Sequence, residues 1–88
     1  DFQRFPALRL AMDALAEGGA IPTVLNAANE IAVERFLEGR LAFAGLARTV
    51  RQICEQFSKD GFSREVAGVE DALAVDHIAR ERTRTILA

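Results

Sequence analysis

The side chains best suited to chemistry in this chain are two glutamates, one histidine and one cysteine. Glu30 and Glu34 lie four residues apart, so a helix would place both carboxylates on one face. A carboxylate metal centre in a helical bundle needs Glu-x-x-His pairs from facing helices, because one helical turn brings both ligands to the same ion. His77 directly follows Asp76 and stands far from either glutamate. The spacing therefore predicts a solvated acidic row and no metal site.

Cys54 is the only cysteine of the chain, and it lies among apolar residues at helical spacing. A nucleophilic thiol needs a neighbouring base or positive charge that lowers its pKa. His77 is distant in sequence, so we predict a buried, unreactive thiol. A lone cysteine cannot form an internal disulfide, which fits a reducing compartment.

Asn26 and Asn29 carry amides on a segment that we expect to be largely buried, where polar groups need hydrogen-bond partners. Two interpretations stay open: the amides bond to backbone ends or a partner surface, or they bind a ligand. The first is favoured. The pair Gly18-Gly19 lacks the preceding strand and the spacing of a phosphate-binding glycine loop.

Composition indicates one globular domain, with 88 residues, 50% of them hydrophobic and 27% charged. A net charge of −2 and the lack of Trp and Tyr do not favour a nucleic-acid partner. No apolar run approaches the roughly 20 residues that span a bilayer, and no signal-peptide pattern is present, so we expect a cytoplasmic protein without a membrane partner. The chain begins at Asp1 and not at Met, from which we expect a segment of a longer polypeptide.

Apolar residues recur at helical spacing in four segments that Gly or Pro separates. The first three cover about 6–17, 22–38 and 42–58. The fourth begins either at Val69 or at Asp76, whose carboxylate suits an N-cap. Residues 61–68 form a predicted loop anchored by Phe62 and Val66. No segment shows strand-like alternation, and short connections favour antiparallel neighbours, so residues 1–88 are predicted to form a single all-α domain, a four-helix up-and-down bundle.

The second segment is apolar around most of its circumference, which predicts a central helix covered on more than one side by its neighbours. Its only polar row consists of Asn26, Glu30, Glu34 and Glu38. The predicted buried stripes are, in chain order, Leu8, Ala11, Met12 and Leu15; Val24, Leu25, Ala28, Ala32 and Phe36; Phe43, Leu46, Ala47, Val50, Ile53, Cys54 and Phe57; and Val75, Ile78, Ala79, Thr83, Ile86 and Leu87.

Three blocks of this sequence carry a family resemblance: FPALRLA at 5–11, LNAANEIAVERFL at 25–37, and VEDAL with DHIAR within 69–80. Together they resemble the C-terminal domain of 1-deoxy-D-xylulose 5-phosphate reductoisomerase. The resemblance implies an oxidoreductase and isomerase of the non-mevalonate isoprenoid pathway. Such an enzyme makes 2-C-methyl-D-erythritol 4-phosphate by a metal-assisted rearrangement, with Mg²⁺ or Mn²⁺, and a reduction by NADPH.

The family places the dinucleotide on an N-terminal domain, and the metal and phosphate on a central domain that forms a homodimer. The resemblance therefore implies that this segment holds no catalytic, cofactor-binding or metal-binding residue. Its implied partners are those two domains of the same enzyme, which it would support.

Two other classes of function stay as alternatives. One is a free-standing helical module that binds a partner helix in a groove. The other is a small DNA-binding bundle, with a turn at 39–41 and with Arg48, Arg51 and Gln52 on an exposed face. The weak net charge disfavours the second more strongly.

Overall fold

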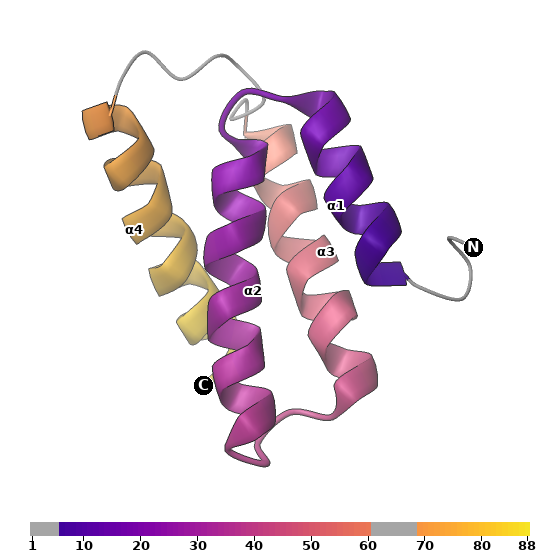
Figure 1. Cartoon of the computed structure of the whole chain (residues 1–88). Coiled ribbons are helices and arrows are strands. Elements are labelled where there is room, and N and C mark those ends of the chain that lie inside the picture. Colours follow the sequence, from indigo (N-terminus) through magenta and orange to yellow (C-terminus); the bar gives the residue numbers. More distant parts are fainter. Residues whose placement is uncertain (1–5, 61–68) are drawn as a thin grey trace.

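The computed structural model describes residues 6–60 and 69–88, and these form four helices. They are α1 (Pro6–Glu17), α2 (Ile21–Leu37), α3 (Phe43–Lys59) and α4 (Val69–Leu87). Successive helices run in opposite directions (Figure 1), and the described residues contain no strand. The predicted all-α, up-and-down four-helix bundle is thus confirmed.

The predicted limits of α1, α2 and α3 are correct to within one residue at each end. For α4 the earlier of the two predicted starts, Val69, is correct. Asp76 therefore lies inside the helix, and its predicted role as an N-cap is wrong. Instead its carboxylate accepts a hydrogen bond from Arg80, one turn further along. Phe62 and Val66 lie outside the described residues.

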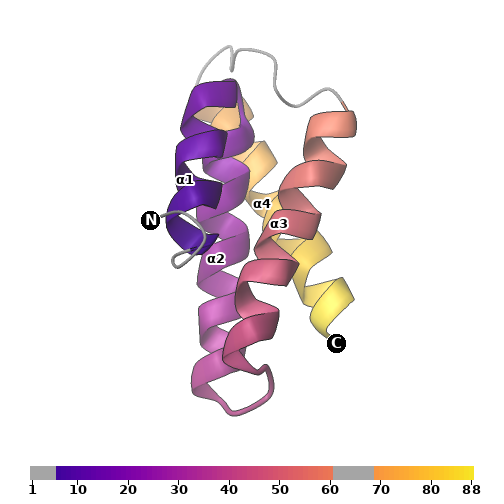
Figure 2. The same ribbon diagram turned by 90° about the vertical axis from the view of Figure 1, so that its right-hand side faces the viewer.

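Helix α2 is the central member of the bundle and contacts all three other helices. Figures 1 and 2 show α1 and α4 on opposite flanks of α2, with α3 behind it. Within the described ranges α1 and α4 do not meet, so one side of α2 stays open between them. The residues of α2 that face the core are Ile21, Val24, Ala27, Ala28, Ile31 and Ala32. Small alanines in this set let the neighbouring helices approach closely.

The core opposite α2 comes mainly from α3 and α4. It contains Thr49, Val50, Ile53, Cys54, Phe57, Val75, Ala79 and Thr83. The two buried threonine hydroxyls donate hydrogen bonds within their own helices, from Thr49 to the carbonyl oxygen of Gly45 at 2.8 Å and from Thr83 to that of Ala79 at 2.7 Å. Their polar atoms are thus satisfied without disturbing the apolar packing.

Glycines end the first two helices. Gly18 and Gly39 have φ values of +73° and +74°, a left-handed conformation that side chains disfavour. After α2 the N–H of Gly39 bonds to the carbonyl oxygen of Phe36, and that of Arg40 bonds to Arg35 at 2.9 Å. The chain can therefore reverse direction and start α3 within a few residues.

The predicted buried stripes include more residues than the structure buries. Five predicted core residues are exposed instead: Met12, Phe36, Phe43, Ile78 and Ile86. Spacing alone assumes that each helix has neighbours along its whole length. Here α1 and α4 flank α2 without touching each other. The first turn of α3 extends past the start of α1 (Figure 1), and Phe43 in that turn is exposed. The side chains of Leu8, Ala11 and Leu15 lie outside the described set. Across the described ranges, no helix combines the length and apolarity that crossing a membrane requires.

Candidate functional site

The open side of α2 is the candidate site, and it carries no charged residue. We call it the uncharged stripe; it consists of Pro22, Asn26, Asn29, Val33, Phe36 and Leu37. These positions repeat at three and four residues, so they share one face of the helix. Asn26, Asn29, Phe36 and Leu37 are exposed, while Pro22 and Val33 are half-buried.

The expected burial of Asn26 and Asn29 is wrong for this chain. Both amides are exposed, because the space between α1 and α4 is not filled by another helix. Of the two interpretations of these amides, a partner surface stays compatible with their exposed position. The sequence interpretation missed Pro22, Val33 and Leu37 as members of the same face. The signal that could have identified them is the lack of charge at six positions of one helical face.

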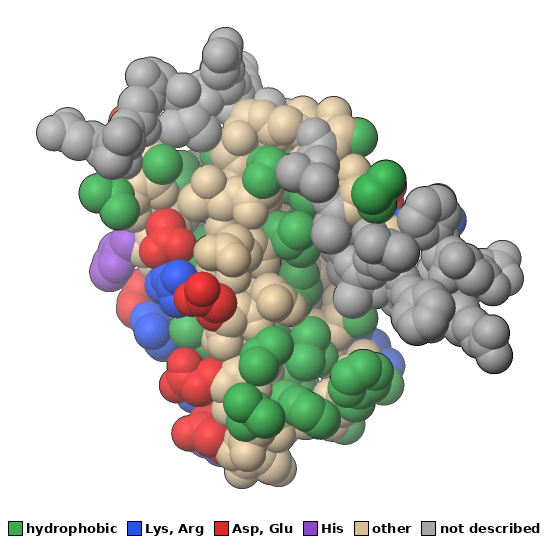
Figure 3. Space-filling model, viewed as in Figure 1, with side chains coloured by type: hydrophobic (Ala, Val, Ile, Leu, Met, Phe, Trp, Pro, Cys, Tyr) green, Lys and Arg blue, Asp and Glu red, His purple; other side chains and the backbone are tan. Residues whose placement is uncertain are grey.

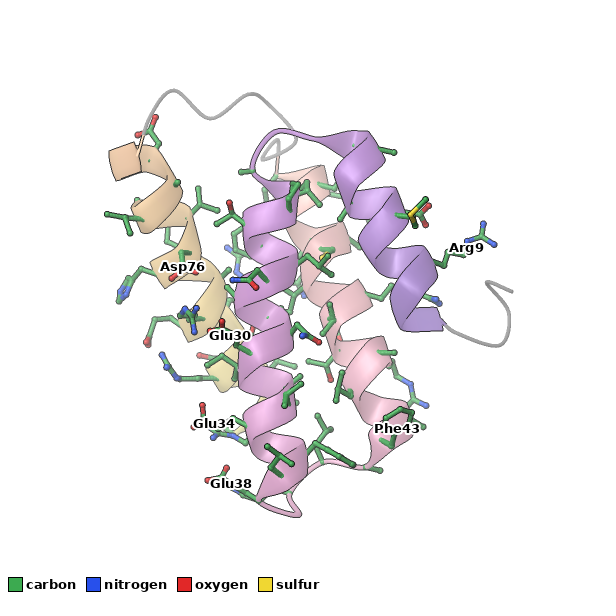
Figure 4. The ribbon with its side chains drawn as sticks, in the orientation of Figure 1. Arg9, Glu30, Glu34, Glu38, Phe43 and Asp76 are labelled. Atoms are coloured by element: carbon green, nitrogen blue, oxygen red, sulfur yellow. The ribbon has the colours of Figure 1, made fainter. Side chains whose placement is uncertain are left out.

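An apolar cluster adjoins the stripe where α2 ends and α3 begins. We call it the end patch; it consists of Phe36, Leu37 and Phe43. The rings of Phe36 and Phe43 meet edge to face, with centroids 5.7 Å apart and planes at 68°. Leu37 is 77% exposed and Phe43 is 76% exposed. Figure 3 shows hydrophobic side chains gathered at this end of the molecule, and Figure 4 places Phe43 there. Adjacent exposed apolar side chains of this kind make the end patch a candidate contact surface.

Charged residues gather on the α4 side of the stripe (Figure 3). The predicted acidic row is exposed there, and Figure 4 shows Glu30, Glu34 and Glu38 following one another along α2. Glu30 is not merely solvated, because its Oε2 lies 2.6 Å from Nη2 of Arg80. The Nε of Arg80 donates to Asp76 at 2.8 Å. These hydrogen bonds, to Asp76 first and then to Glu30, raise the pKa of Arg80 above its ordinary value. The charged guanidinium joins α4 to α2 through Glu30.

Arg35 offsets the negative charge of the acidic row at its C-terminal end. Its Nη1 lies 3.3 Å from Glu38 and 3.8 Å from Glu34. Its Nε is buried without a hydrogen-bond partner, the one such side-chain atom found in the described part of the chain. Within residues 6–60 and 69–88 no group of three or more His, Cys, Asp or Glu side chains is placed to hold a metal ion. His77 is exposed on α4.

Cys54 is buried in the core, as predicted. Burial raises the pKa of its thiol from 9.0 to about 11, and the negative charges of Glu17 and then Glu55 add to the shift. A thiol that holds its proton so firmly is a poor nucleophile and a poor metal ligand at neutral pH. The environment of Cys54 therefore agrees with a packing role.

The basic face of α3 is solvent-exposed, as expected from its sequence. Arg48, Arg51 and Gln52 all lie on it. A DNA-binding helix-turn-helix joins its helices at about 90° to 120°. Here α2 and α3 run antiparallel, side by side (Figures 1 and 2). This geometry gives no support to the DNA-binding alternative.

Comparison with known proteins identifies the family. The family model described as "DXP reductoisomerase C-terminal domain" matches residues 1–82. A 1-deoxy-D-xylulose 5-phosphate reductoisomerase from Afipia carboxidovorans is 49% identical over 96% of this chain and 21% of its own length. The enzyme of the same name from Geobacter metallireducens is 45% identical over 99% of this chain and 22% of its own length.

A solved structure agrees with these sequence matches. The 1-deoxy-D-xylulose 5-phosphate reductoisomerase from Zymomonas mobilis, in complex with NADPH, superimposes with a TM-score of 0.88 and 38% sequence identity. That match covers 99% of this chain and 22% of the Zymomonas chain. This chain thus spans about a fifth of the length of the relatives it matches. With the resemblance of its sequence motifs, these matches show that the chain belongs to the family of DXP reductoisomerase C-terminal domains.

Proposed function

We propose that this domain is a structural support of a 1-deoxy-D-xylulose 5-phosphate reductoisomerase. The proposal rests on family membership together with one observation: the reactive side chains are buried or paired within the bundle. Cys54 is buried and protonated, and Glu30 and Asp76 are engaged by Arg80. Such a bundle would hold the neighbouring domains of the enzyme in a productive arrangement.

The parent enzyme would convert 1-deoxy-D-xylulose 5-phosphate to 2-C-methyl-D-erythritol 4-phosphate. A divalent metal, Mg²⁺ or Mn²⁺, would stabilise negative charge during the rearrangement, and NADPH would supply hydride. The NADPH in the structure of the Zymomonas mobilis relative supports the choice of nucleotide. We further propose that the parent acts as a cytoplasmic homodimer.

The described residues are not suited to hold the divalent metal or NADPH. They present no cluster of His, Cys, Asp or Glu that could hold the metal. The paired glycines Gly18 and Gly19 join two helices, whereas a dinucleotide-binding glycine loop follows a strand. Both groups would therefore bind to other parts of the enzyme, and we assign no catalytic, cofactor-binding or metal-binding residue to this segment.

Deleting the segment from Asp1 onward in the parent enzyme tests the supporting role. We expect a lower midpoint of thermal unfolding and a large loss of NADPH-dependent turnover, because the remaining domains lose a packing surface. The matched control is the full-length Gln52→Glu variant, which changes an exposed amide of α3. If the shortened enzyme keeps the stability and turnover of the intact one, the supporting role is wrong.

A further inference from the structure

We propose that the uncharged stripe of α2, together with the end patch, is the surface through which this bundle docks onto the rest of its own polypeptide. The occupant is the part of the same enzyme chain outside these 88 residues. This inference rests on the proposed function and adds to it the location of the contact.

The distribution of charge distinguishes the uncharged stripe from a helix face that points to water. A helix face that points to water normally carries charged side chains, and charged residues make up 27% of this chain. The exposed side of α3 follows that rule, with Arg48, Arg51 and Glu55. The stripe on α2 has no charge at any of its six positions. The charges nearest to it, Glu30 and Glu34, stand at its α4 margin and have arginine partners.

The exposed side chains of the stripe are also chemically suited to contact another polypeptide. Asparagine is a weak helix former, so local helix stability does not account for Asn26 and Asn29 in the middle of α2. Each amide offers both donors and an acceptor, which match the N–H and C=O groups of another polypeptide. A charged partner such as nucleic acid, or a lipid surface, would find no opposite charge on this face. The stripe therefore suits a neutral protein surface.

Polar and apolar groups are arranged on this face as they are in protein interfaces. The end patch supplies an aromatic pair and a leucine, with Leu37 and Phe43 both more than three-quarters exposed. Protein interfaces commonly combine such apolar anchors with a polar margin. Figure 3 shows this order, with the apolar end next to the neutral length of α2 and the charges along one edge.

The lengths of the relatives indicate which polypeptide covers this surface. This chain covers only 21% of the Afipia enzyme and 22% of the Zymomonas chain, so the greater part of such an enzyme lies beyond the bundle. Contacts between domains of one chain are commonly small and partly polar, because the linker keeps both surfaces at high effective concentration. A stable contact between two separate copies would need roughly 800 Å² per partner. One helix face with a small apolar end suits the intrachain contact better.

Cysteine labelling of the full-length enzyme tests the surface. Asn29→Cys places a thiol on the stripe, and Gln52→Cys places one on α3; both parent side chains are amides that are exposed in the bundle. Circular dichroism first confirms that both variants fold. A maleimide reagent, with the labelled peptides followed by mass spectrometry, should modify position 29 about tenfold more slowly than position 52, because access governs thiol modification. Equal rates would overturn the proposal.

Photocrosslinking of the full-length enzyme tests the occupant. Leu37 is replaced by p-benzoylphenylalanine, and Arg51 is replaced in the same way as the control. We expect position 37 to crosslink within a single chain to a peptide outside these 88 residues, and position 51 to give no such product. A crosslink joining the α2 helices of two chains would overturn the assignment to the same polypeptide.

The two proposals can fail separately. Deletion of the bundle reports on the supporting role, whereas labelling at position 29 reports only on the contact surface. If the deletion abolishes turnover and the two positions label equally fast, the supporting role holds and the docking surface is wrong. If position 29 is protected and the deletion has no effect, the docking surface holds and the supporting role is wrong.

Discussion

Arg80 of α4 and Glu30 of α2 form the shortest ion pair between two helices in the described structure, with Nη2 and Oε2 2.6 Å apart. The same guanidinium also bonds to Asp76 of its own helix through Nε. Arg80 is thereby held in a fixed orientation at the α2–α4 boundary, next to the buried Ala79. The pair explains how a helix with few neighbours other than α2 is aligned on the bundle.

Replacing Arg80 by Met should lower the free energy of unfolding of the 88-residue chain by about 1 kcal/mol. A double-mutant cycle with Glu30→Gln should give a coupling of roughly 0.5 to 1 kcal/mol, kept small because water reaches both side chains. Urea titration followed by far-UV circular dichroism measures both values, since the chain has no Trp or Tyr for fluorescence. The control cycle uses Arg84→Met and Glu81→Gln, an exposed pair within α4. Couplings of equal size in both cycles would contradict a special role for Arg80.

Truncating Phe57 should destabilise the bundle far more than the same change at Phe43. Phe57 is 0% exposed, and the centroid of its ring lies 4.3 Å from the guanidinium carbon of Arg82. Phe43 is 76% exposed. We expect Phe57→Ala to cost about 3 to 5 kcal/mol and Phe43→Ala less than about 1 kcal/mol. If Phe57→Ala does not fold, the smaller change Ile53→Val tests the same core, at an expected cost of about 0.5 to 1.5 kcal/mol. Similar urea midpoints for the two phenylalanine variants would show that the core has been misplaced.

Stability should fall in alkaline solution through Cys54. Its pKa is about 11 in the folded chain against an ordinary 9.0, so the unfolded chain loses the thiol proton first as the pH rises. The contribution of the protonated thiol is therefore complete below pH 9.0 and is lost between 9.0 and about 11. Urea unfolding across that range should show a steeper decline for the natural chain than for Cys54→Ala. Parallel pH profiles would contradict a buried, proton-retaining thiol.

Replacing Gly39 by Ala should cost about 1 to 2 kcal/mol. A Cβ there would meet no atom within 4 Å, so the cost arises from the positive φ of +74° and not from a clash. Gly39→Asn should cost less, because asparagine tolerates this conformation better. The control is Gly45→Ala, where the Cβ would approach only the flexible end of Leu41 at 2.9 Å. A neutral Gly39→Ala in urea titrations would mean that the turn does not need a left-handed residue.

The sequence by itself determined the helices and the identity of the family. Gly18 and Gly39 end helices because glycine adopts a positive φ without a steric penalty, whatever packs around it. In the same way, the apolar spacing of Val50, Ile53 and Phe57 defines a buried face of α3 without knowledge of its neighbours. The burial of Cys54 followed from the same pattern. The motifs at 5–11, 25–37 and 69–80 were sufficient for the resemblance that the family model then matched.

Only the tertiary structure decided which helix faces stay open and which charges find partners. Periodicity predicted buried positions for Phe43 and Ile78, and burial for Asn29, yet all three are exposed. It also could not pair Arg80 with Glu30, which lie on different helices. The physical reason is that a repeat of 3.6 residues fixes where a side chain points relative to its own helix axis. Whether anything lies in that direction depends on the placement of the other helices, and here α1 and α4 flank α2 without closing over it.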